Sequence, residues 1–196
     1  MPRFLVPTRK REILNRLDPR HPLVFDVHEL GRRAGSMQRI SRTVPAPADL
    51  GNDVLGVPEG TDIALDLRLE SVIEGVLATG TAQARAVGEC VRCLEPLERE
   101  LQADFQELYA YPDVEIEGDD GEELRLEGDL LDLQQVLRDA VVLALPLLPV
   151  CRDDCPGLCP DCGARLDDDP EHSHETADPR WSALQGLLNT EAREEK

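Results

Sequence analysis

The chain has 196 residues, a formal net charge of −19, and 41% hydrophobic but only 3% aromatic residues, which predicts one medium-sized domain, or a domain with a small appendage, around a mostly aliphatic core. No apolar run approaches the roughly 20 residues of a membrane span, and the N-terminus has no apolar stretch long enough for a secretory signal. We therefore expect a cytoplasmic protein with no membrane partner.

The charge is unevenly distributed along the chain. Residues 1–44 carry ten Arg or Lys and four Asp or Glu, whereas residues 45–196 carry eleven basic and thirty-six acidic side chains. This asymmetry predicts a basic, partly disordered N-terminal arm over 1–20 on an acidic body; a solvated basic terminus on an acidic protein is the alternative. We expect the core over 21–150, with a Cys-rich segment and a C-terminal helix packed on it over 151–190.

The N-terminal part contains signals for both helix and strand. A short amphipathic helix is predicted within 8–18, and a strand over 22–31 that ends at Gly31. A basic loop then leads to a second strand over 38–44. Residues 45–60 are dense in Pro, Gly and Asp, which predicts an irregular connection.

Three longer strands follow in the centre of the chain. Apolar and polar residues alternate over 62–70, and two further strands are predicted over 75–89 and 97–109. Together they predict an antiparallel meander with one face exposed to solvent. Cys90 and Cys93 are expected at or near the hairpin turn between the last two strands.

The following segment changes from acidic to apolar. Residues 113–132 contain ten carboxylates and one arginine, which predicts an exposed loop. Asp129 is the predicted N-cap of a helix through 130–145, and Pro146 ends that helix because proline clashes with the preceding turn. A C-terminal helix is predicted to begin after its N-cap, Asp178.

The cysteines occur in closely spaced pairs that are typical of zinc ligands. A Cys-x-x-Cys turn places two sulfurs on one side of a tight loop, and two such loops complete a tetrahedral site. Disulfides are disfavoured in a protein without an export signal. The nearby Asp153, Asp154 and Asp161 oppose free thiolates, which a divalent cation would stabilise, so Zn²⁺ is predicted ahead of an iron–sulfur cluster or redox-active thiols. The predicted metal ligands are Cys90, Cys93, Cys151, Cys155, Cys159 and Cys162.

Three groupings of these ligands are compatible with the spacing. In the first grouping, the four C-terminal cysteines bind one ion. In the second, Cys90 and Cys93 bind one ion together with two of those four, which connects the end of the predicted helix to the sheet. In the third grouping two ions are bound. The first set is then Cys90, Cys93, Cys151 and Cys155. The second set is Cys159, Cys162, His172 and His174.

The histidines have weaker signals than the cysteines. His172 and His174 are possible metal ligands, although a His-x-His in an acidic loop is more often solvated. His21 and His28 have no partner motif and are expected to be structural. The predicted fold is therefore α+β: an antiparallel β-sheet or meander with one or two packed helices and a C-terminal Cys-rich zinc-binding segment.

No catalytic motif is present in the sequence. There is no glycine-rich phosphate loop, no GxSxG and no HExxH, and a zinc ion closed by four protein ligands has no open position for a substrate. We therefore expect a protein that is not an enzyme.

The ordered combination of CVRCLEP, LALPLLPVC, CPGLCPDCGARL and DPRWSALQGL resembles the YceD family, the large ribosomal RNA subunit accumulation proteins. HELGRRAGSMQRISRTV further resembles the actinobacterial members, and the likeness covers roughly residues 20–190. The resemblance implies a small non-enzymatic ribosome-biogenesis factor that supports accumulation of large-subunit ribosomal RNA, with the six cysteines as candidate metal ligands. Where relatives often have Cys-x-Cys after CPxCG, this chain has His172-Ser173-His174, which keeps the capacity to bind a metal.

The charge distribution indicates where such a factor would meet its partners. Arginines near the N-terminus would bind RNA phosphates in a salt-dependent, weakly specific manner. The predicted RNA-binding residues are Arg32, Arg33, Arg39 and Arg42, with Arg9, Lys10 and Arg11 as further candidates. The expected partner is ribosomal RNA or a precursor of the large subunit. The alternative is an acidic chaperone or binding module for a basic large-subunit ribosomal protein, which would contact the 113–132 carboxylates.

Overall fold

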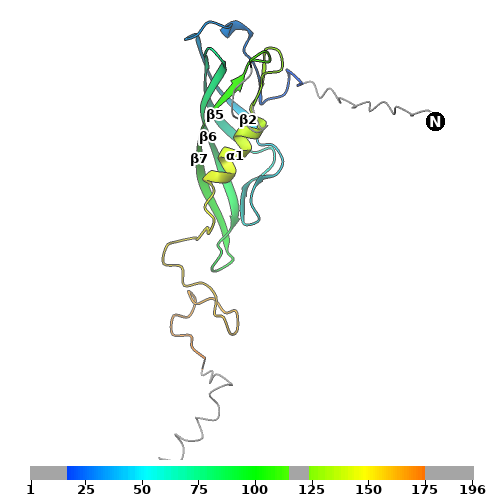
Figure 1. Ribbon diagram of the computed structural model, residues 1–196. Coiled ribbons are helices and arrows are strands. Elements are labelled where there is room, and N and C mark those ends of the chain that lie inside the picture. Colours follow the sequence, from blue (N-terminus) through cyan, green and yellow to red (C-terminus); the bar gives the residue numbers. More distant parts are fainter. Residues whose placement is uncertain (1–16, 115–123, 175–196) are drawn as a thin grey trace, which may run out of the picture.

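The structure is a computed structural model that describes residues 17–114 and 124–174 (Figure 1). The basic arm over 1–20 and the helix expected within 8–18 lie mostly outside these residues, and the helix expected after Asp178 lies entirely outside them. In the described part of the chain no helix is long and apolar enough to cross a membrane.

An antiparallel sheet of six strands forms most of the molecule. The order is β2-β5-β6-β4-β3, and β7 pairs with β6. Its strands are β2 (Met37–Pro45), β3 (Leu50–Gly51), β4 (Leu55–Val57), β5 (Asp62–Ser71), β6 (Gly75–Glu89) and β7 (Pro96–Ala110). The remaining elements are β1 (Val24–Asp26), a 3-10 turn (His28–Leu30), β8 (Leu130–Asp132) and the helix α1 (Gln134–Ala144). The predicted α+β class and the antiparallel meander are confirmed.

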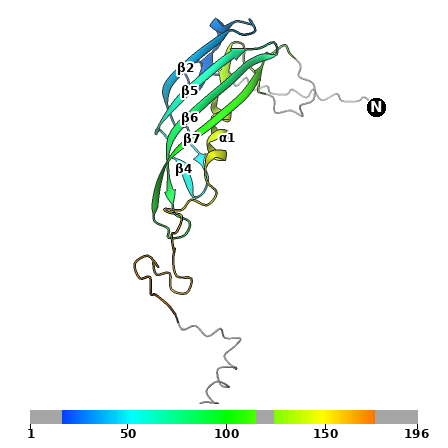
Figure 2. The same ribbon diagram turned by 90° about the vertical axis from the view of Figure 1, so that its left-hand side faces the viewer.

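The core lies between one face of the sheet and α1, which Figure 2 shows behind the strands. In β5, Ile63, Leu65, Leu67 and Leu69 are buried on that face, while the intervening residues face outward. This two-residue period follows from the pleat of a strand, and it buries an aliphatic row in the core. From α1, which lies mainly against β7, Val136, Leu137 and Val141 enter the same core.

The helix α1 begins later than the sequence predicts. Its first residue is Gln134, and the Asp132 carboxylate accepts a hydrogen bond from the Gln134 N–H at 2.9 Å. Asp129 is not the N-cap; its carboxylate instead lies 2.9 Å from His28 Nδ1. The helix ends at Ala144, immediately before an extended Leu145 and Pro146, as predicted.

Two corrections concern the N-terminal half. The strand predicted over 22–31 has only the three residues of β1, because a 3-10 turn follows and Gly31 ends it with φ +57°. The segment 45–60 is not wholly irregular, since β3 and β4 form a small hairpin within it. Gly51 and Gly56 are paired there, and a Cβ on Gly51 would lie 2.5 Å from Gly56 Cα. Glycine is therefore required for the two strands to approach.

A third correction concerns the acidic segment. The exposed loop expected over 113–132 is wrong at Leu126 and Leu131, which are buried, and at 130–132, where β8 pairs with β1. The two leucines join the core because they are apolar, while Glu127 and Asp129 between them are exposed. The acidic composition of the segment gave no indication of these two core positions.

Candidate metal centre

The hairpin between β6 and β7 brings two cysteines to the tip of the sheet. The Cys90 N–H donates to the Glu95 carbonyl at 2.8 Å, and the Leu94 N–H donates back to the Cys90 carbonyl at 2.8 Å. Leu94 has φ +59°, which reverses the chain within this short loop. Cys90 and Cys93 lie at the hairpin turn, as predicted, and both are buried there.

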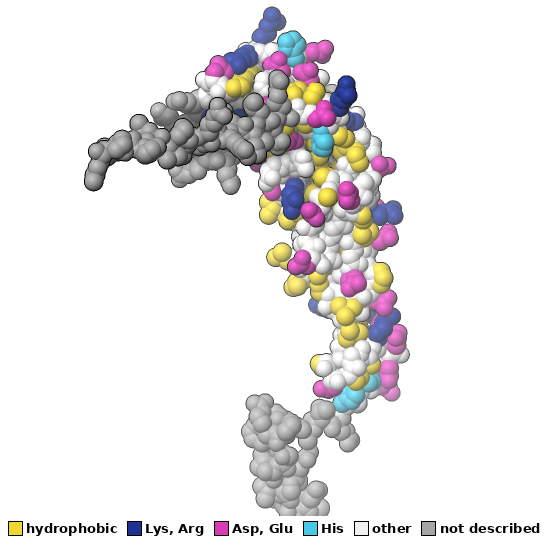
Figure 3. All heavy atoms as spheres, turned by 90° about the vertical axis from the view of Figure 1, so that its right-hand side faces the viewer, with side chains coloured by type: hydrophobic (Ala, Val, Ile, Leu, Met, Phe, Trp, Pro, Cys, Tyr) yellow, Lys and Arg dark blue, Asp and Glu magenta, His cyan; other side chains and the backbone are white. Residues whose placement is uncertain are grey.

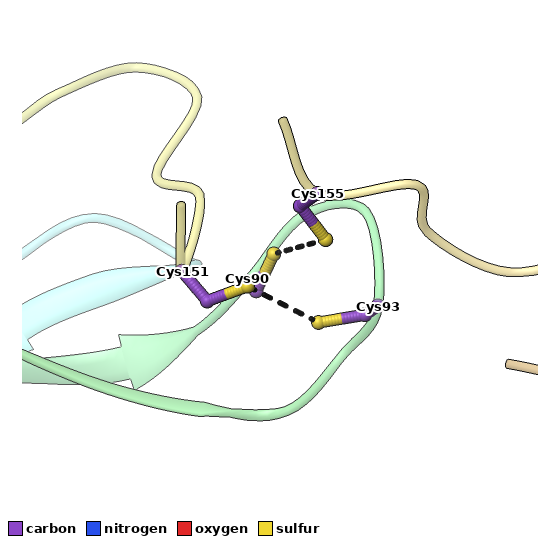
Figure 4. A group of neighbouring side chains, drawn as sticks. All are labelled: Cys90, Cys93, Cys151 and Cys155. Atoms are coloured by element: carbon purple, nitrogen blue, oxygen red, sulfur yellow. Dashed lines mark hydrogen bonds between the residues drawn. The ribbon is translucent and has the colours of Figure 1, made fainter. Parts of the chain in front are cut away.

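The exit of α1 brings two more cysteines to the same point. The Val91 N–H donates to the Pro149 carbonyl at 2.9 Å, which places Cys151 beside the hairpin. The Cys90 and Cys155 sulfurs are 3.9 Å apart, and those of Cys93 and Cys151 are 3.8 Å apart (Figure 4). All four sulfurs lie within 4.8 Å of one another.

These distances fit a tetrahedral thiolate site. Zn–S bonds of about 2.3 Å place the sulfurs of such a site roughly 3.8 Å apart. None of the six cysteines is in a disulfide. Four thiolates without an open position are typical of a structural centre, and soft sulfur donors fit Zn²⁺.

Burial and backbone amides act on the thiols of this cluster in opposite directions. Burial opposes ionisation of Cys90, but hydrogen bonds from the backbone at Cys93, Cys151 and Arg92 outweigh it and lower the pKa of that thiol to about 6. The neighbouring Cys155 thiol, followed by burial, raises the pKa of Cys151 to about 12. Ionisation of Cys90 is thus favoured by the surrounding backbone, whereas a cation would favour ionisation of Cys151.

A second group forms in the following segment from Cys159, Cys162, His172 and His174. Its four ligand atoms also lie within 4.8 Å of one another. His172 Nε2 is 3.2 Å and His174 Nε2 is 3.1 Å from Cys162 Sγ. Two thiolates and two imidazoles form a set of donors that fits Zn²⁺.

The turn of the second group depends on backbone geometry. The Gly163 N–H donates to the Cys159 carbonyl at 2.8 Å, and the Cys159 N–H donates to the Ala164 carbonyl at 2.7 Å. Gly163 has φ +73°, a conformation that favours glycine. The backbone at Cys162 and Asp161 lowers the pKa of the Cys159 thiol by hydrogen bonding.

The structure thus brings together the ligand sets of the two-ion grouping. The compact grouping of the four C-terminal cysteines does not form, because Cys151 and Cys155 lie against the hairpin instead. The segment after α1 is joined to the sheet through Cys90 and Cys93, a connection that the second grouping also predicts. His172 and His174 lie beside Cys162 and are not simply solvated.

Arginines around the first cluster were not predicted as site residues. The Arg92 guanidinium donates to the Asp153 carbonyl at 3.2 Å and to the Cys155 carbonyl at 3.0 Å, so it holds the second ligand loop against the first. Arg99 donates to the Val150 carbonyl at 2.5 Å, directly before Cys151. The position of Arg92 between the two cysteines of CVRC is the feature of the sequence that could have indicated its role near the ligands.

Two ion pairs connect the second group to the first. Arg165 donates to the Glu95 carboxylate at 2.7 Å, which joins the second group to the hairpin turn. Arg152, next to Cys151, pairs with the Asp167 carboxylate. These contacts are partly exposed, so each contributes little alone, but together they orient the two loops.

The predicted RNA-binding arginines are not equivalent. Arg32 makes two contacts with the Asp113 carboxylate, the shorter at 2.8 Å, and its guanidinium lies 4.5 Å from the centre of the Tyr111 ring. The Arg42 guanidinium lies 4.0 Å from the centre of the Phe25 ring, and burial lowers its pKa. Both side chains are thus already engaged within the protein.

The sheet also separates two of these arginines. Arg42 is paired with Leu65, on the face that carries the core, whereas Arg39 is paired with Arg68 on the opposite face. Arg33 is exposed in the loop before β2. The four arginines therefore do not form one continuous surface.

The histidines expected to be structural have local partners. His28 Nδ1 lies 2.9 Å from the Asp129 carboxylate, which raises the pKa of His28 through their hydrogen bond and opposite charge. The Leu23 N–H donates to His21 Nδ1 at 3.3 Å. Neither histidine lies in a group of metal ligands found among the described residues.

Known proteins similar to this chain include mycobacterial and plant sequences. An uncharacterized protein of Mycobacterium tuberculosis is 44% identical over 188 residues, which cover 95% of this chain and 88% of that protein. One from Mycobacterium leprae is 41% identical over 169 residues, covering 85% and 78%. The chloroplastic large ribosomal RNA subunit accumulation protein YCED homolog 1 of Zea mays is 27% identical over 129 residues, covering 51% and 41%. No solved structure matches.

The family comparison covers both cysteine segments. The family model described as large ribosomal RNA subunit accumulation protein YceD matches residues 78–188. This range includes most of β6, all of β7 and α1, and all the ligands of both groups. The chain therefore belongs to the YceD family.

Proposed function

We propose that this protein is a non-enzymatic ribosome-biogenesis factor that supports accumulation of large-subunit ribosomal RNA in the cytoplasm. The family description supports the connection with this RNA. The closed set of four thiols at the hairpin tip supports a structural rather than a catalytic centre, since no ligand position remains for a substrate. Deleting the gene should lower the ratio of large-subunit to small-subunit ribosomal RNA, and an unchanged ratio would contradict the proposal.

We further propose that Zn²⁺ occupies both ligand groups. The donor sets are four sulfurs in one and two sulfurs with two imidazoles in the other, and both are common for zinc. Elemental analysis of protein purified without added zinc should give about two equivalents per chain. Less than about half an equivalent, with all six thiols titratable in the folded protein, would overturn this assignment.

For direct contact with ribosomal RNA, Arg33 and Arg39 are the stronger of the four candidates. Both are exposed, and neither forms an ion pair within the described residues. Replacing both by Ala should weaken RNA binding and reduce its salt dependence by about one unit of slope for each lost phosphate contact. Arg85→Ala is the matched control, because Arg85 is an exposed arginine paired with Glu98.

A second candidate function is an acidic binding module for a basic large-subunit ribosomal protein. The chain has 40 Asp or Glu and 21 Lys or Arg, and Figure 3 shows carboxylates along the length of the drawn face with basic side chains among them. The acidic excess favours a basic partner over RNA. Co-purification with a basic ribosomal protein after nuclease treatment would support it. Loss of every such protein after nuclease treatment would favour the RNA-dependent alternative.

A further inference from the structure

Strand β7 has a strand neighbour on one side over most of its length. In the described part of the chain it pairs with β6 in an unbroken register from Gly75 with Ala110 to Glu89 with Pro96. Only at its end is the other side used. There the Ala110 N–H donates to the Leu124 carbonyl at 2.8 Å, and the Leu126 N–H donates to the Ala110 carbonyl at 3.0 Å.

The pairing of Ala110 reveals which backbone groups of β7 point away from β6. In an antiparallel strand the N–H and C=O of one residue point to the same side, and the side alternates along the chain. The backbone groups of Asp104 and Gln106 therefore point outward like those of Ala110. Within the described residues they have no hydrogen-bond partner. An unpaired row of this kind is a template for an additional strand.

A groove runs along the same edge, between β7 and α1. It encloses about 680 Å³. Phe105 and Val136 are its buried apolar residues, Ala140 is partly buried, and Leu143 is 84% exposed at its border. Apolar side chains of an added strand would therefore find an apolar surface beside the backbone groups that pair with it.

The border of the groove is acidic. Asp104, Glu107 and Asp139 line it, and no Lys or Arg does. Asp104 accepts a hydrogen bond from Thr81 at 2.7 Å, and Asp139 accepts one from Gln135 at 2.9 Å. Neither carboxylate has a cationic partner among the described residues. Their negative charge is thus left for a ligand to neutralise.

We propose that an extended, basic segment of a partner protein binds this edge as an additional strand on β7. Its backbone pairs with the outward groups of Asp104 and Gln106, its apolar side chains enter the groove towards Phe105 and Leu143, and its Lys or Arg side chains meet the carboxylates. The proposal rests on the second candidate function above and gives it a surface and a binding mode. The carboxylates disfavour RNA here, as they do the chain's own segment 115–123, which contains six carboxylates and no basic residue.

The test uses the full-length protein and a fluorescently labelled peptide of about nine residues in which Lys or Arg alternates with Val or Leu. Gln106→Pro removes one outward N–H without removing a hydrogen bond to β6, and should weaken peptide binding roughly tenfold, the effect of about 1.4 kcal/mol. Gln106→Ala is the matched control. It keeps the N–H and should bind within about twofold of the original.

A second pair of variants tests the charges and does not depend on proline being tolerated. Glu107→Gln with Asp139→Asn should weaken binding and reduce its salt dependence, whereas Glu59→Gln with Asp62→Asn removes two charges outside the groove and should not. Equal binding by all variants overturns the proposal. The proposal is also overturned if a polyuridine oligonucleotide binds and the same variants weaken its binding equally. It is overturned as well if the protein is a dimer that Gln106→Pro dissociates. Ribosomal RNA levels in cells are measured separately, so failure here leaves the first proposed function intact.

Discussion

The ring of Phe105 occupies the space that a side chain at Gly80 would fill. The two residues are direct partners across β6 and β7, and a Cβ on Gly80 would lie 2.4 Å from Phe105 Cζ. Glycine has no side chain to pack against its neighbours, and an aromatic ring that lies over a cross-strand glycine supplies the missing contacts. The same ring forms the apolar surface of the groove between β7 and α1.

The first prediction follows from this contact. Gly80→Ala should lower the free energy of unfolding by about 1–3 kcal/mol, because the ring must move out of a packed position. Urea denaturation measures the change. In a Phe105→Leu background the same substitution should cost clearly less, and an equal cost in both backgrounds would mean that the ring is not the obstacle.

The second prediction concerns the independence of the two ligand groups. Cys90→Ser should remove the ion of the first group and leave the ion of the second group bound, because Cys90 belongs only to the first group. Native mass spectrometry should then show one zinc per chain. Cys162→Ser is the matched change in the second group and should also leave one ion.

The two variants should differ in stability. Loss of the first ion separates the helix exit from the sheet, whereas loss of the second affects only the loop beyond Cys159, so Cys90→Ser should lower the melting temperature more. A larger loss for Cys162→Ser would show that the second group, not the first, stabilises the fold.

The third prediction concerns a residue that orients ligands without binding the metal. Arg92→Ala should keep the number of bound ions but lower the zinc affinity of the first group by about 10–100-fold, because the Asp153 and Cys155 carbonyls lose their common donor. Competition with a chelator measures this affinity. Arg85→Ala, an exposed arginine on β6, should leave the affinity unchanged.

The fourth prediction concerns pH. The hydrogen bond and charge of Asp129 hold the pKa of His28 above its usual value of 6.5. The contact therefore stabilises the folded state fully below about pH 6.5, and this contribution is lost as the pH rises through the higher folded pKa. NMR titration of His28 should show the raised pKa, and Asp129→Asn should return it towards 6.5. A His28 pKa unaffected by Asp129→Asn would contradict the contact.

The long strands were predictable because the alternation of apolar and polar residues continues over many residues. In β5 it extends from Ile63 to Leu69, and this pattern predicts which face of the strand is buried. The hairpin of β3 and β4 was missed because strands of two and three residues contain no period to detect. β8 was missed because Leu131 lies in a segment whose composition is dominated by carboxylates.

The grouping of the metal ligands could not be predicted for a different reason. The spacing of the cysteines allowed both Cys151 with Cys155 and Cys159 with Cys162 to meet the hairpin. The choice depends on where α1 delivers the chain, and the hydrogen bond from Val91 to the Pro149 carbonyl decides it. That contact is tertiary and leaves no pattern in the sequence.

The first ligand group also sets an order of events during synthesis. Cys155 follows Cys90 by 65 residues, and Cys151 follows Cys93 by 58. At roughly 5–20 residues per second, a nascent chain holds the hairpin cysteines for about 3–13 s before their partners are made. During that interval two reduced thiols wait at the ribosome without a complete site. A metal ion held by all four thiols can therefore be bound only after β6, β7 and α1 have been synthesised.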